Sequence, residues 1–410
     1  MSTHESCAWL CGAGDFTLAA AAPPLTPFAP PVMAFLEALS AALLEDKALR
    51  EYPDLTALAF FCRRGNLEKH RRDYETWSKG NRVGRGLVFH IAPGNVPLNF
   101  AYSLVAALLA GNASLVKAPS RDFPQTRLVC QVMEGLLASS FQTLRPYVNV
   151  ISYPRERQEI TQELSTLCDV RIIWGGDETV THIRRIPLSP RAFDITFPDR
   201  YSLLVLRASA VLALEDKQLQ AAAQGFYNDT YLLDQNACTS PRLLYWLAEN
   251  EDTPSLHKTR AAQDRFWKAV HSYAAPRYTL QPVVSVDKLT AFYEAALRLG
   301  EVYRPAGGDN LIARIGVKEL SPQVESIRCP GGLFVEYIDT DLSALLALVS
   351  PKFQTVTYLG IDPQELRQLI LSHGLKGIDR IVPLGHSLDF SLAWDGYDLI
   401  NILSRQVETW

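Results

Sequence analysis

The amino-acid sequence predicts an α/β fold in which helices cover both faces of a parallel sheet. Three stretches carry this prediction: GLVFHIAPGN from Gly86, ASLVK at 113–117 and VRIIW at 170–174. Each is a short apolar run followed closely by Pro or Gly, as expected when a strand buried on both faces ends in a loop. Segments with helical spacing separate the runs. Alternation of this kind is typical of a parallel sheet.

The elements around these strands follow from local signals. Residues 20–32 (AAAPPLTPFAPPV) are rich in Pro and Ala and predict an extended arm, and 33–49 predict a helix without proline. Residues 99–110 predict an apolar helix that stops at Gly111-Asn112. The other elements expected in this half are a helix near 125–139, a strand at 148–151, helices at 156–167 and 178–183, and a strand at 202–206.

The second half has a mixed α/β character and is harder to divide. We expect a helix at 214–227, the loop LLDQNACTSP, helices at 242–250 and 260–275, and a strand, a loop and an apolar segment from Arg380 onward. Residues 277–322 give no sharp signal and are assigned to strands and loops. Because 410 residues exceed what one hydrophobic core usually organises, two domains, or one domain split by insertions, are expected, and we place a boundary near Arg207.

Composition excludes several classes of function. The chain is 48% hydrophobic and 20% charged, with a formal net charge of -4, which disfavours a general binder of nucleic-acid phosphates. The first 22 residues lack a basic segment before an apolar run, and no apolar stretch approaches the ~20 residues that span a bilayer. We therefore expect a cytoplasmic protein without a membrane anchor.

The seven cysteines are an odd number without a CxxC pair or a histidine at metal-binding spacing. Reduced thiols and no metal site are therefore expected, and most of the cysteines should be small buried hydrophobes. Cys238 is the exception. It lies in DQNACTSP at 234–241, where polar residues and Pro241 predict a loop that leads into a helix. Amides at a helix start favour a thiolate, although a buried loop cysteine is the alternative.

Other candidates lie at the ends of the predicted strands. Asn95 follows the first strand and offers a neutral amide donor for an oxyanion, or it bonds its own turn. Lys117 ends the second strand, where it would meet a ribose or phosphate, or solvent. Gly175 and Gly176 follow the strand VRIIW and would let a pyrophosphate approach the backbone, although two-glycine turns are common.

Taken together and in this order, these residues resemble the aldehyde dehydrogenase superfamily. The stretch PGNVPLNFAYSLVAALLAGNASLVKAPS is similar to the superfamily's core motif, and the resemblance covers about residues 84–245. Within the superfamily the chain looks most like the LuxC-type acyl-CoA reductases. DRYSLLVL at 199–206, DQNACTSP at 234–241 and the tail from 379 to 405 carry this closer likeness.

The resemblance implies roles for the candidates. Cys238 would be the nucleophile, Asn95 and the Cys238 backbone N–H would form the oxyanion hole, and Lys117 would hold the adenosine ribose. Gly175 and Gly176 would border the pyrophosphate. One feature departs from the oxidising members: the segment 195–199 (ITFPD) lacks the glutamate that activates water there. Without a hydrolytic base, an acyl-enzyme is preserved for reduction.

The implied domains are an N-terminal arm at 1–32, a Rossmann-like cofactor-binding domain at 33–206, and a catalytic domain at 207–385. A C-terminal segment at 386–410 would pack back on the cleft. Ser120 stands where NAD-preferring members often carry a glutamate, and Arg121 follows it, so NADPH is expected over NADH; an exposed Arg121 that contacts no ligand is the alternative.

The implied reaction is reduction of an acyl thioester to an aldehyde with NADPH, through an acyl-cysteine. The expected substrate is a coenzyme A thioester, in particular a fatty acyl-CoA. Reductive release of an acyl or peptidyl group from a carrier protein is the alternative, and an aldehyde-oxidising dehydrogenase and a catalytically silent scaffold are rivals. An acyl-protein synthetase or acyl carrier protein is an expected partner, and a homo-oligomer is the expected assembly.

The C-terminal segment holds two further clusters. Trp394, Asp395 and Gly396 would line or close an acyl channel, or serve packing, which is the commoner role of such clusters. His386 and Asp389 would suit a proton relay, but spacing alone assigns them no role.

Overall fold

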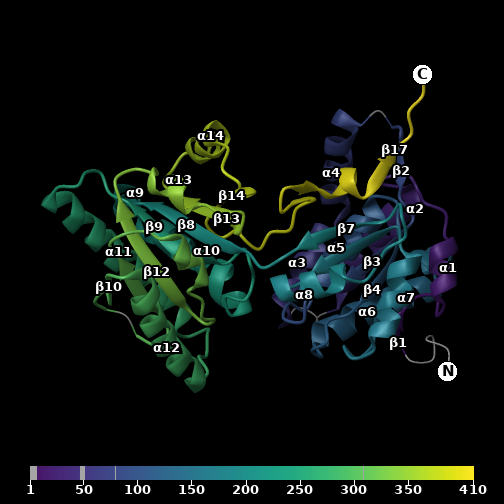
Figure 1. The fold of residues 1–410 in the computed structure, drawn as a ribbon, viewed down its shortest axis with the longest axis horizontal. Coiled ribbons are helices and arrows are strands. Elements are labelled where there is room, and N and C mark those ends of the chain that lie inside the picture. Colours follow the sequence, from purple (N-terminus) through teal and green to yellow (C-terminus); the bar gives the residue numbers. More distant parts are fainter. Residues whose placement is uncertain (1–6, 47–50, 79, 308) are drawn as a thin grey trace. The chain divides into compact units, whose positions relative to one another are not determined.

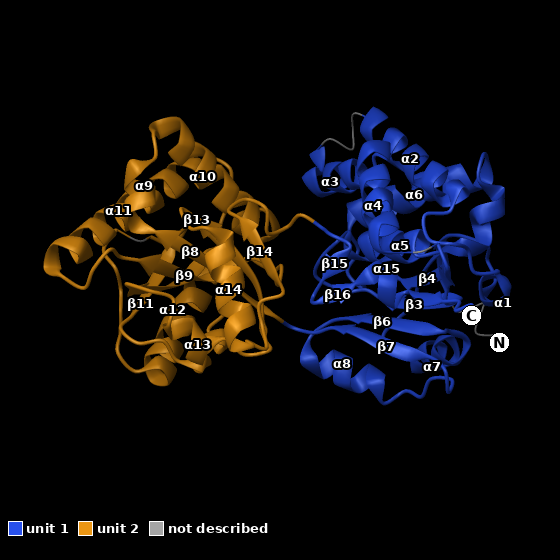
Figure 2. Ribbon diagram, turned by 90° about the horizontal axis from the view of Figure 1, so that it is seen from above, with its two compact units in different colours: residues 1–199, 390–410 blue, residues 200–389 orange. Residues whose placement is uncertain are grey.

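The computed structural model describes residues 7–46, 51–78, 80–307 and 309–410 (Figure 1). The chain forms two compact units (Figure 2). Unit 1 comprises residues 1–199 together with 390–410, and unit 2 comprises residues 200–389. The chain therefore enters unit 2 once and returns to unit 1 at its C-terminal end.

Unit 1 is built on a six-stranded sheet in the order β1-β5-β4-β3-β6-β7. Its elements are β1 (Ala8–Cys11), α1 (Phe16–Ala21), α2 (Pro30–Glu45), α3 (Pro53–Phe61), α4 (Arg64–Trp77), β2 (Arg82–Gly84), β3 (Leu87–Ile91), α5 (Asn99–Leu109), β4 (Ala113–Lys117), α6 (Pro124–Ala138), η3 (Gln142–Tyr147), β5 (Val148–Ser152), α7 (Gln158–Leu167), β6 (Val170–Trp174), α8 (Asp177–Arg184), β7 (Phe193–Phe197), β15 (Ala393–Trp394), β16 (Tyr397–Asp398), α15 (Leu399–Ile402) and β17 (Ser404–Gln406).

The sheet of unit 1 is doubly wound, as the sequence predicts. All neighbouring strands are parallel except β1, which pairs antiparallel with β5. The chain runs from β3 outward to β4 and β5 and then returns to the other side of β3 as β6. Right-handed crossovers then place α5 and α6 on one face and α7 and α8 on the other (Figure 2).

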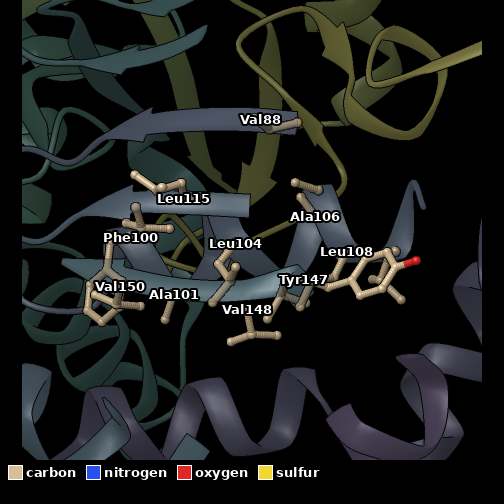
Figure 3. Close-up of a cluster of buried hydrophobic side chains, with 14 of the residues drawn as sticks. Val88, Phe100, Ala101, Leu104, Ala106, Leu108, Leu115, Tyr147, Val148 and Val150 are labelled. Carbon is tan, nitrogen blue, oxygen red and sulfur yellow. The ribbon is translucent and has the colours of Figure 1, made fainter. Parts of the chain in front are cut away.

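The core of unit 1 forms where α5 packs on the strands. Figure 3 shows Ala101 and Leu104 of α5 beside Leu115 of β4 and Val148 and Val150 of β5. These side chains are at most 2% exposed. Because β3, β4, β5 and β6 are buried on both faces, their residues do not alternate between buried and exposed, and even the polar Asn149 of β5 and Arg171 of β6 are buried.

The N-terminal region departs from the predicted arm. Residues 8–11 form the edge strand β1, and α1 follows it. The extended stretch is limited to residues 22–29, because Pro30 begins α2 as a first-turn proline, three residues earlier than predicted. The last residues of the predicted helix, 47–49, lie outside the described residues.

The C-terminal segment completes unit 1. Strand β17 pairs antiparallel with β2, so residues far apart in the sequence lie side by side (Figure 1). The buried Asn112 side chain connects three segments of this region by hydrogen bonds. Its Oδ1 accepts from the Arg85 and Gly86 amides at 2.6 and 3.2 Å. Its Nδ2 donates to the Ala107 and Leu403 carbonyls at 3.1 and 2.9 Å. All four hydrogen-bonding positions of the amide are therefore used.

Unit 2 contains a seven-stranded sheet in the order β10-β11-β12-β9-β8-β13-β14, in which only β10 is antiparallel to its neighbour. Its elements are β8 (Tyr201–Arg207), α9 (Ala208–Ala213), α10 (Asp216–Thr230), η4 (Tyr231–Leu233), β9 (Pro241–Leu247), α11 (Thr253–Ala274), α12 (Pro282–Leu299), β10 (Val302–Tyr303), β11 (Ala313–Val317), η5 (Pro322–Ser326), β12 (Leu333–Asp339), α13 (Ala344–Leu348), β13 (Phe353–Leu359), α14 (Pro363–His373) and β14 (Arg380–Pro383).

Three sequence predictions for this half were wrong. Strand β8 belongs to the sheet of unit 2, so the division falls near 199/200 rather than at Arg207. Residues 241–247 form the central strand β9 instead of a helix, because a short apolar run buried on both faces has no period that distinguishes it from a helix. The stretch 277–322, predicted to form strands and loops, contains α12, whose Val-rich first turns obscured its helical spacing.

Within the described part of the chain, none of the helices combines the length and apolar character that a membrane crossing requires.

We predict that Asn112→Ala destabilises unit 1 by about 3 kcal/mol, because it leaves buried amides and carbonyls without partners. Thermal unfolding should show a melting temperature lower by about 10 °C. Asn401→Ala is the matched control, since the Asn401 side chain is exposed. If both variants melted at the native temperature, the hydrogen bonds of the Asn112 side chain would not stabilise unit 1.

Candidate active site

The candidate site residues of unit 1 gather at one edge of its sheet. In the register of the strands, Ile91 of β3 stands beside Lys117 of β4 and Ile173 of β6. The loops that leave these three strands therefore emerge together at their carboxyl ends. The chain passes from β3 to β4 and β5 on one side of β3 and then crosses to β6 on the other side. The strand order therefore reverses beside β3, and such a switch point is where open α/β sheets bind ligands.

Asn95 lies on the loop between β3 and α5 and is exposed. The loop is anchored close by, because Thr126 Oγ1 of α6 donates to the Pro97 carbonyl at 2.9 Å. Among the described residues, no hydrogen bond engages the Asn95 side chain. Its amide is thus an available donor on a loop that is anchored at Pro97.

Lys117 is half-buried at the end of β4, and its Nζ lies 4.3 Å from the centroid of the Tyr153 ring. The Tyr153 hydroxyl lies 2.9 Å from Thr161 Oγ1, which fixes the ring. Burial and the nearby Arg155 lower the pKa of Lys117, against the opposing effect of Glu156. The ammonium is therefore held over an aromatic face instead of moving freely in solvent.

Ser120 and Arg121 follow β4 on an exposed loop. The Arg121 guanidinium lies 5.2 Å from the Phe123 ring centroid. The neighbouring carboxylate of Asp122 pairs with Arg127 at 2.8 Å. Within the described ranges, Arg121 takes part in no ion pair, so its charge is available to an anionic ligand.

Gly175 and Gly176 stand between β6 and α8, where Gly176 is the N-cap. A Cβ built on Gly176 would have no heavy atom within 4 Å, so the backbone there is open to close approach. Asp177 and Glu178 occupy the first turn of α8. Their charges argue against a pyrophosphate seated on the helix end itself, so we expect the glycines to border such a group rather than bind it.

A buried polar chain, which the sequence analysis missed, supports this edge. Trp174 Nε1 donates to Ser103 Oγ at 3.1 Å, and His90 Nδ1 lies 2.8 Å from the same oxygen. The other ring nitrogen of His90 lies 3.3 Å from Ser114 Oγ. The chain links β6, α5, β3 and β4 directly beneath the loops of the site. Its sequence signal was a lone histidine within the apolar run of β3.

Cys238 lies in unit 2, on the loop between η4 and β9. The helix predicted after Pro241 is absent, because β9 begins there, so a helix start does not explain the state of the thiol. Ala237 and Thr239 are buried while Cys238 is partly exposed, so the loop is packed on both sides of Cys238. Ser202 Oγ donates to the Cys238 carbonyl at 2.7 Å and fixes that peptide.

The other cysteines differ from Cys238 in burial or in position. Cys11, Cys62, Cys130, Cys168 and Cys329 are buried. Burial raises the pKa of Cys62 and of Cys168 to about 12, which disfavours their thiolates. Cys7 is half-exposed, but burial raises its pKa as well. Position and exposure thus distinguish Cys238 from five of the other six thiols.

Of the two C-terminal clusters, residues 394–396 serve packing and a turn, whereas His386 and Asp389 form an exposed pair. Trp394 is buried, and its ring centroid lies 5.1 Å from that of Phe390. Asp395 and Gly396 have φ of 49° and 75° and form the two-residue turn between β15 and β16, so this Asp-Gly pair serves a hairpin. His386 Nδ1 lies 2.7 Å from Asp389 Oδ2 on the exposed end of unit 2.

Comparison with known proteins shows to which family the chain belongs. A family model described as acyl-CoA reductase (LuxC) matches residues 32–298, which is more than half of the chain. The chain belongs to this family. The matched residues include the loop of Asn95, the strand end at Lys117 and the loop of Cys238.

Curated relatives of the family match a shorter region. The long-chain acyl-protein thioester reductase of Aliivibrio fischeri is 30% identical over 169 residues, which are 40% of this chain and 33% of the relative. The corresponding reductase of Vibrio harveyi is 28% identical over 170 residues, 40% of this chain and 32% of the relative. The match thus spans about a third of the length of these relatives.

Solved structures show that the fold is that of aldehyde dehydrogenases. A Mycobacterium tuberculosis aldehyde dehydrogenase complexed with NAD+ aligns with a TM-score of 0.62 and 14% identity. The alignment covers 96% of this chain and 88% of that one. The predicted α/β, aldehyde dehydrogenase-like fold class is therefore confirmed.

We predict that the buried, neutral His90 makes unit 1 acid-sensitive. Burial lowers its pKa from 6.5 to about 3, so the unfolded chain takes up a proton that the folded unit resists. The stability contributed by the neutral ring is present above pH 6.5 and is lost as the pH falls toward 3. At about pH 4.5 the loss is roughly 3 kcal/mol.

Urea unfolding at pH 7 and pH 4.5 measures this contribution. In His90→Gln the difference in unfolding free energy between the two pH values should shrink by about 2 to 3 kcal/mol. His182→Gln, which replaces an exposed histidine of α8, should keep the native difference. An unchanged pH dependence in His90→Gln would show that His90 is not the titrating group.

Proposed function

We propose that this chain reduces an acyl thioester to an aldehyde with NADPH, by way of an acyl group bound to the Cys238 thiol. The observation that carries the proposal is the partly exposed Cys238 on a packed loop within the region that matches the acyl-CoA reductase family. The likeness to aldehyde dehydrogenases supports the same chemistry, because the resemblance implies a cysteine nucleophile at this position.

The Cys238 sulfur performs the first step. As the thiolate it attacks the carbonyl carbon of the thioester, the C–S bond to the carrier breaks, and the carrier leaves as a thiol. The negative charge that develops on the acyl oxygen is stabilised by hydrogen-bond donors, a role that we propose for the Asn95 amide and the Cys238 backbone N–H. The product of this step is an acyl-cysteine.

Reduction then releases the acyl group. NADPH, when bound, supplies a hydride to the acyl carbon. The resulting oxyanion re-forms a carbonyl as the C–S bond to Cys238 breaks, which yields the aldehyde and, after protonation, the free thiol. The segment 195–199 carries no glutamate to activate water, so the acyl-cysteine is protected from hydrolysis.

The acyl carrier has two candidates. The family description names acyl-CoA, whereas the curated relatives are named for acyl-protein thioesters. Both carriers present the same carbonyl and the same leaving thiol to Cys238. The preferred carrier, coenzyme A or an acyl protein such as a synthetase or carrier protein, is therefore a separate question from the chemistry.

The residues at the edge of unit 1 fit an NADPH site. Lys117 is held at the sheet edge for the adenosine ribose, and the open backbone at Gly176 permits close approach of the pyrophosphate. Arg121, which forms no ion pair with any described residue, lies beside Ser120 and suits a 2′-phosphate, which a guanidinium binds with two charge-assisted hydrogen bonds.

Steady-state assays with saturated acyl-CoA thioesters, and with the same acyl groups on a carrier protein, test the proposal. We expect Cys238→Ser to lower NADPH oxidation and trapped aldehyde at least about 1000-fold, because the nucleophile is lost. Cys7→Ser, which alters the other half-exposed thiol, should retain native rates. Native turnover in Cys238→Ser would refute the acyl-cysteine route.

Cofactor preference provides an independent prediction. Arg121→Ser should raise the KM for NADPH by about 10- to 100-fold and leave the KM for NADH within about twofold, because it removes charge-assisted hydrogen bonds to the 2′-phosphate alone. Arg72→Ser, which removes an exposed charge on α4, is the control. Equal changes for both nucleotides would contradict the role of Arg121.

A further inference from the structure

The loop that presents Cys238 begins with strained backbone. Asp234 and Gln235 have φ of 52° and 58°, so two successive residues with side chains adopt the left-handed conformation. Each such residue costs on the order of 1 kcal/mol or more, and it persists only where its surroundings hold it. Something in unit 2 must therefore maintain this turn, three residues before the thiol.

The Gln235 side chain closes the loop around Cys238. It is fully buried, and its Nε2 donates to the Pro241 carbonyl at 3.2 Å and to the Leu333 carbonyl at 3.0 Å. Its Oε1 accepts from the amides of Gly332 and Leu333 at 3.0 and 3.3 Å. The bond to Pro241 joins the two ends of a loop whose middle is Cys238, and the other three tie that loop to the start of β12.

Neighbouring groups hold the same turn. The Gly331 amide donates to the Asp234 carbonyl at 3.1 Å. Arg242 donates to the carbonyls of Gln235 and Cys329, and the buried Lys288 ammonium donates to the Gly331 carbonyl. The backbone around Cys238 is thus fixed from both sides.

Only glycine fits at the centre of this arrangement. Gly332 has a φ of 99°, and a Cβ there would lie 2.4 Å from the Leu311 carbonyl oxygen and 2.6 Å from the Tyr231 hydroxyl. The close approach brings the Gly332 amide to the Gln235 side chain. The turn that receives Gln235 therefore depends on backbone that no other residue could adopt without displacement.

We propose that Gln235 is a positioning residue, whose side-chain amide holds the Cys238 thiol in its reactive geometry by closing the 235–241 loop. This inference rests on the proposed function, in which Cys238 is the nucleophile. Loss of the amide leaves several buried backbone groups without partners and lets the strained turn relax. A displacement of about 1 Å lowers the rate of the chemical step by about 100-fold.

The test is the single-turnover rate at which Cys238 is acylated by an excess of decanoyl-CoA without nucleotide, followed by quenching and peptide mass spectrometry. Gln235→Met keeps the volume and removes all four hydrogen bonds. We expect its acylation rate, per folded protein, to fall about 100-fold, while the thioester concentration that gives half the maximal rate stays within about threefold of the native value.

Gln263→Met is the matched control. Gln263 is buried in the same unit and donates to Glu336 at 3.3 Å, away from the Cys238 loop. It should lose stability but acylate within about threefold of the native rate. Similar rates in both variants would show that Gln235 serves stability alone, which overturns the proposal.

A second variant remains informative if Gln235→Met does not fold. Gln235→Glu has nearly the native shape, and only its protonated carboxyl can donate one of the two lost hydrogen bonds. Because burial raises a carboxyl pKa, the acylation rate relative to the native chain should recover as the pH falls from 8 toward 6. A ratio that does not depend on pH contradicts the positioning role.

The outcomes separate the two proposals. If the native chain forms no acyl-cysteine with either carrier, the proposed function fails and the positioning role fails with it. If the native chain is acylated and Gln235→Met is acylated at the same rate, only the positioning role is overturned.

Discussion

The parallel register of β3 with β4 and β6 is the constraint on which the candidate cofactor site depends. It places Ile91, Lys117 and Ile173 in one row, so the three loops that follow leave the sheet together. A slip of one residue would turn Lys117 from one face of the sheet to the other. The buried chain from Trp174 through Ser103 and His90 to Ser114 crosses the same strands, and its hydrogen bonds can all form only in this register.

The candidate residues of the two units lie at opposite ends of the strands within each sheet. In unit 1 the candidate residues follow the carboxyl ends of strands, the usual location in open α/β sheets. In unit 2 the Cys238 loop precedes β9, so the thiol lies at the amino end of a strand, where that rule gives no guidance. Its geometry is determined by side chains that reach the loop from elsewhere in the unit, above all Gln235 and Ser202.

The sequence predicted the fold of unit 1 well because its strands are short apolar runs separated by helices with clear stops. β4 and β6 coincide with the predicted residues. In unit 2 the prediction failed at β9, where central burial removes alternation, and at α12, where β-branched residues obscure the helix. The position of Cys238 in a loop was predictable from polar neighbours and Pro241. The partners of Gln235 were not, because Gly332 and Leu333 lie about 100 positions away and nothing local indicates the contact.

The central claim is that Cys238 carries the acyl group, and peptide mass spectrometry of the acylated protein tests it most directly. The native chain is mixed with an acyl thioester without nucleotide, digested and mapped, and NADPH is then added to a parallel sample. The account predicts one acyl group per chain on the peptide that contains Cys238, which disappears on addition of NADPH as an equal amount of aldehyde forms. An acyl group on another residue, or its release as free acid, would contradict the account.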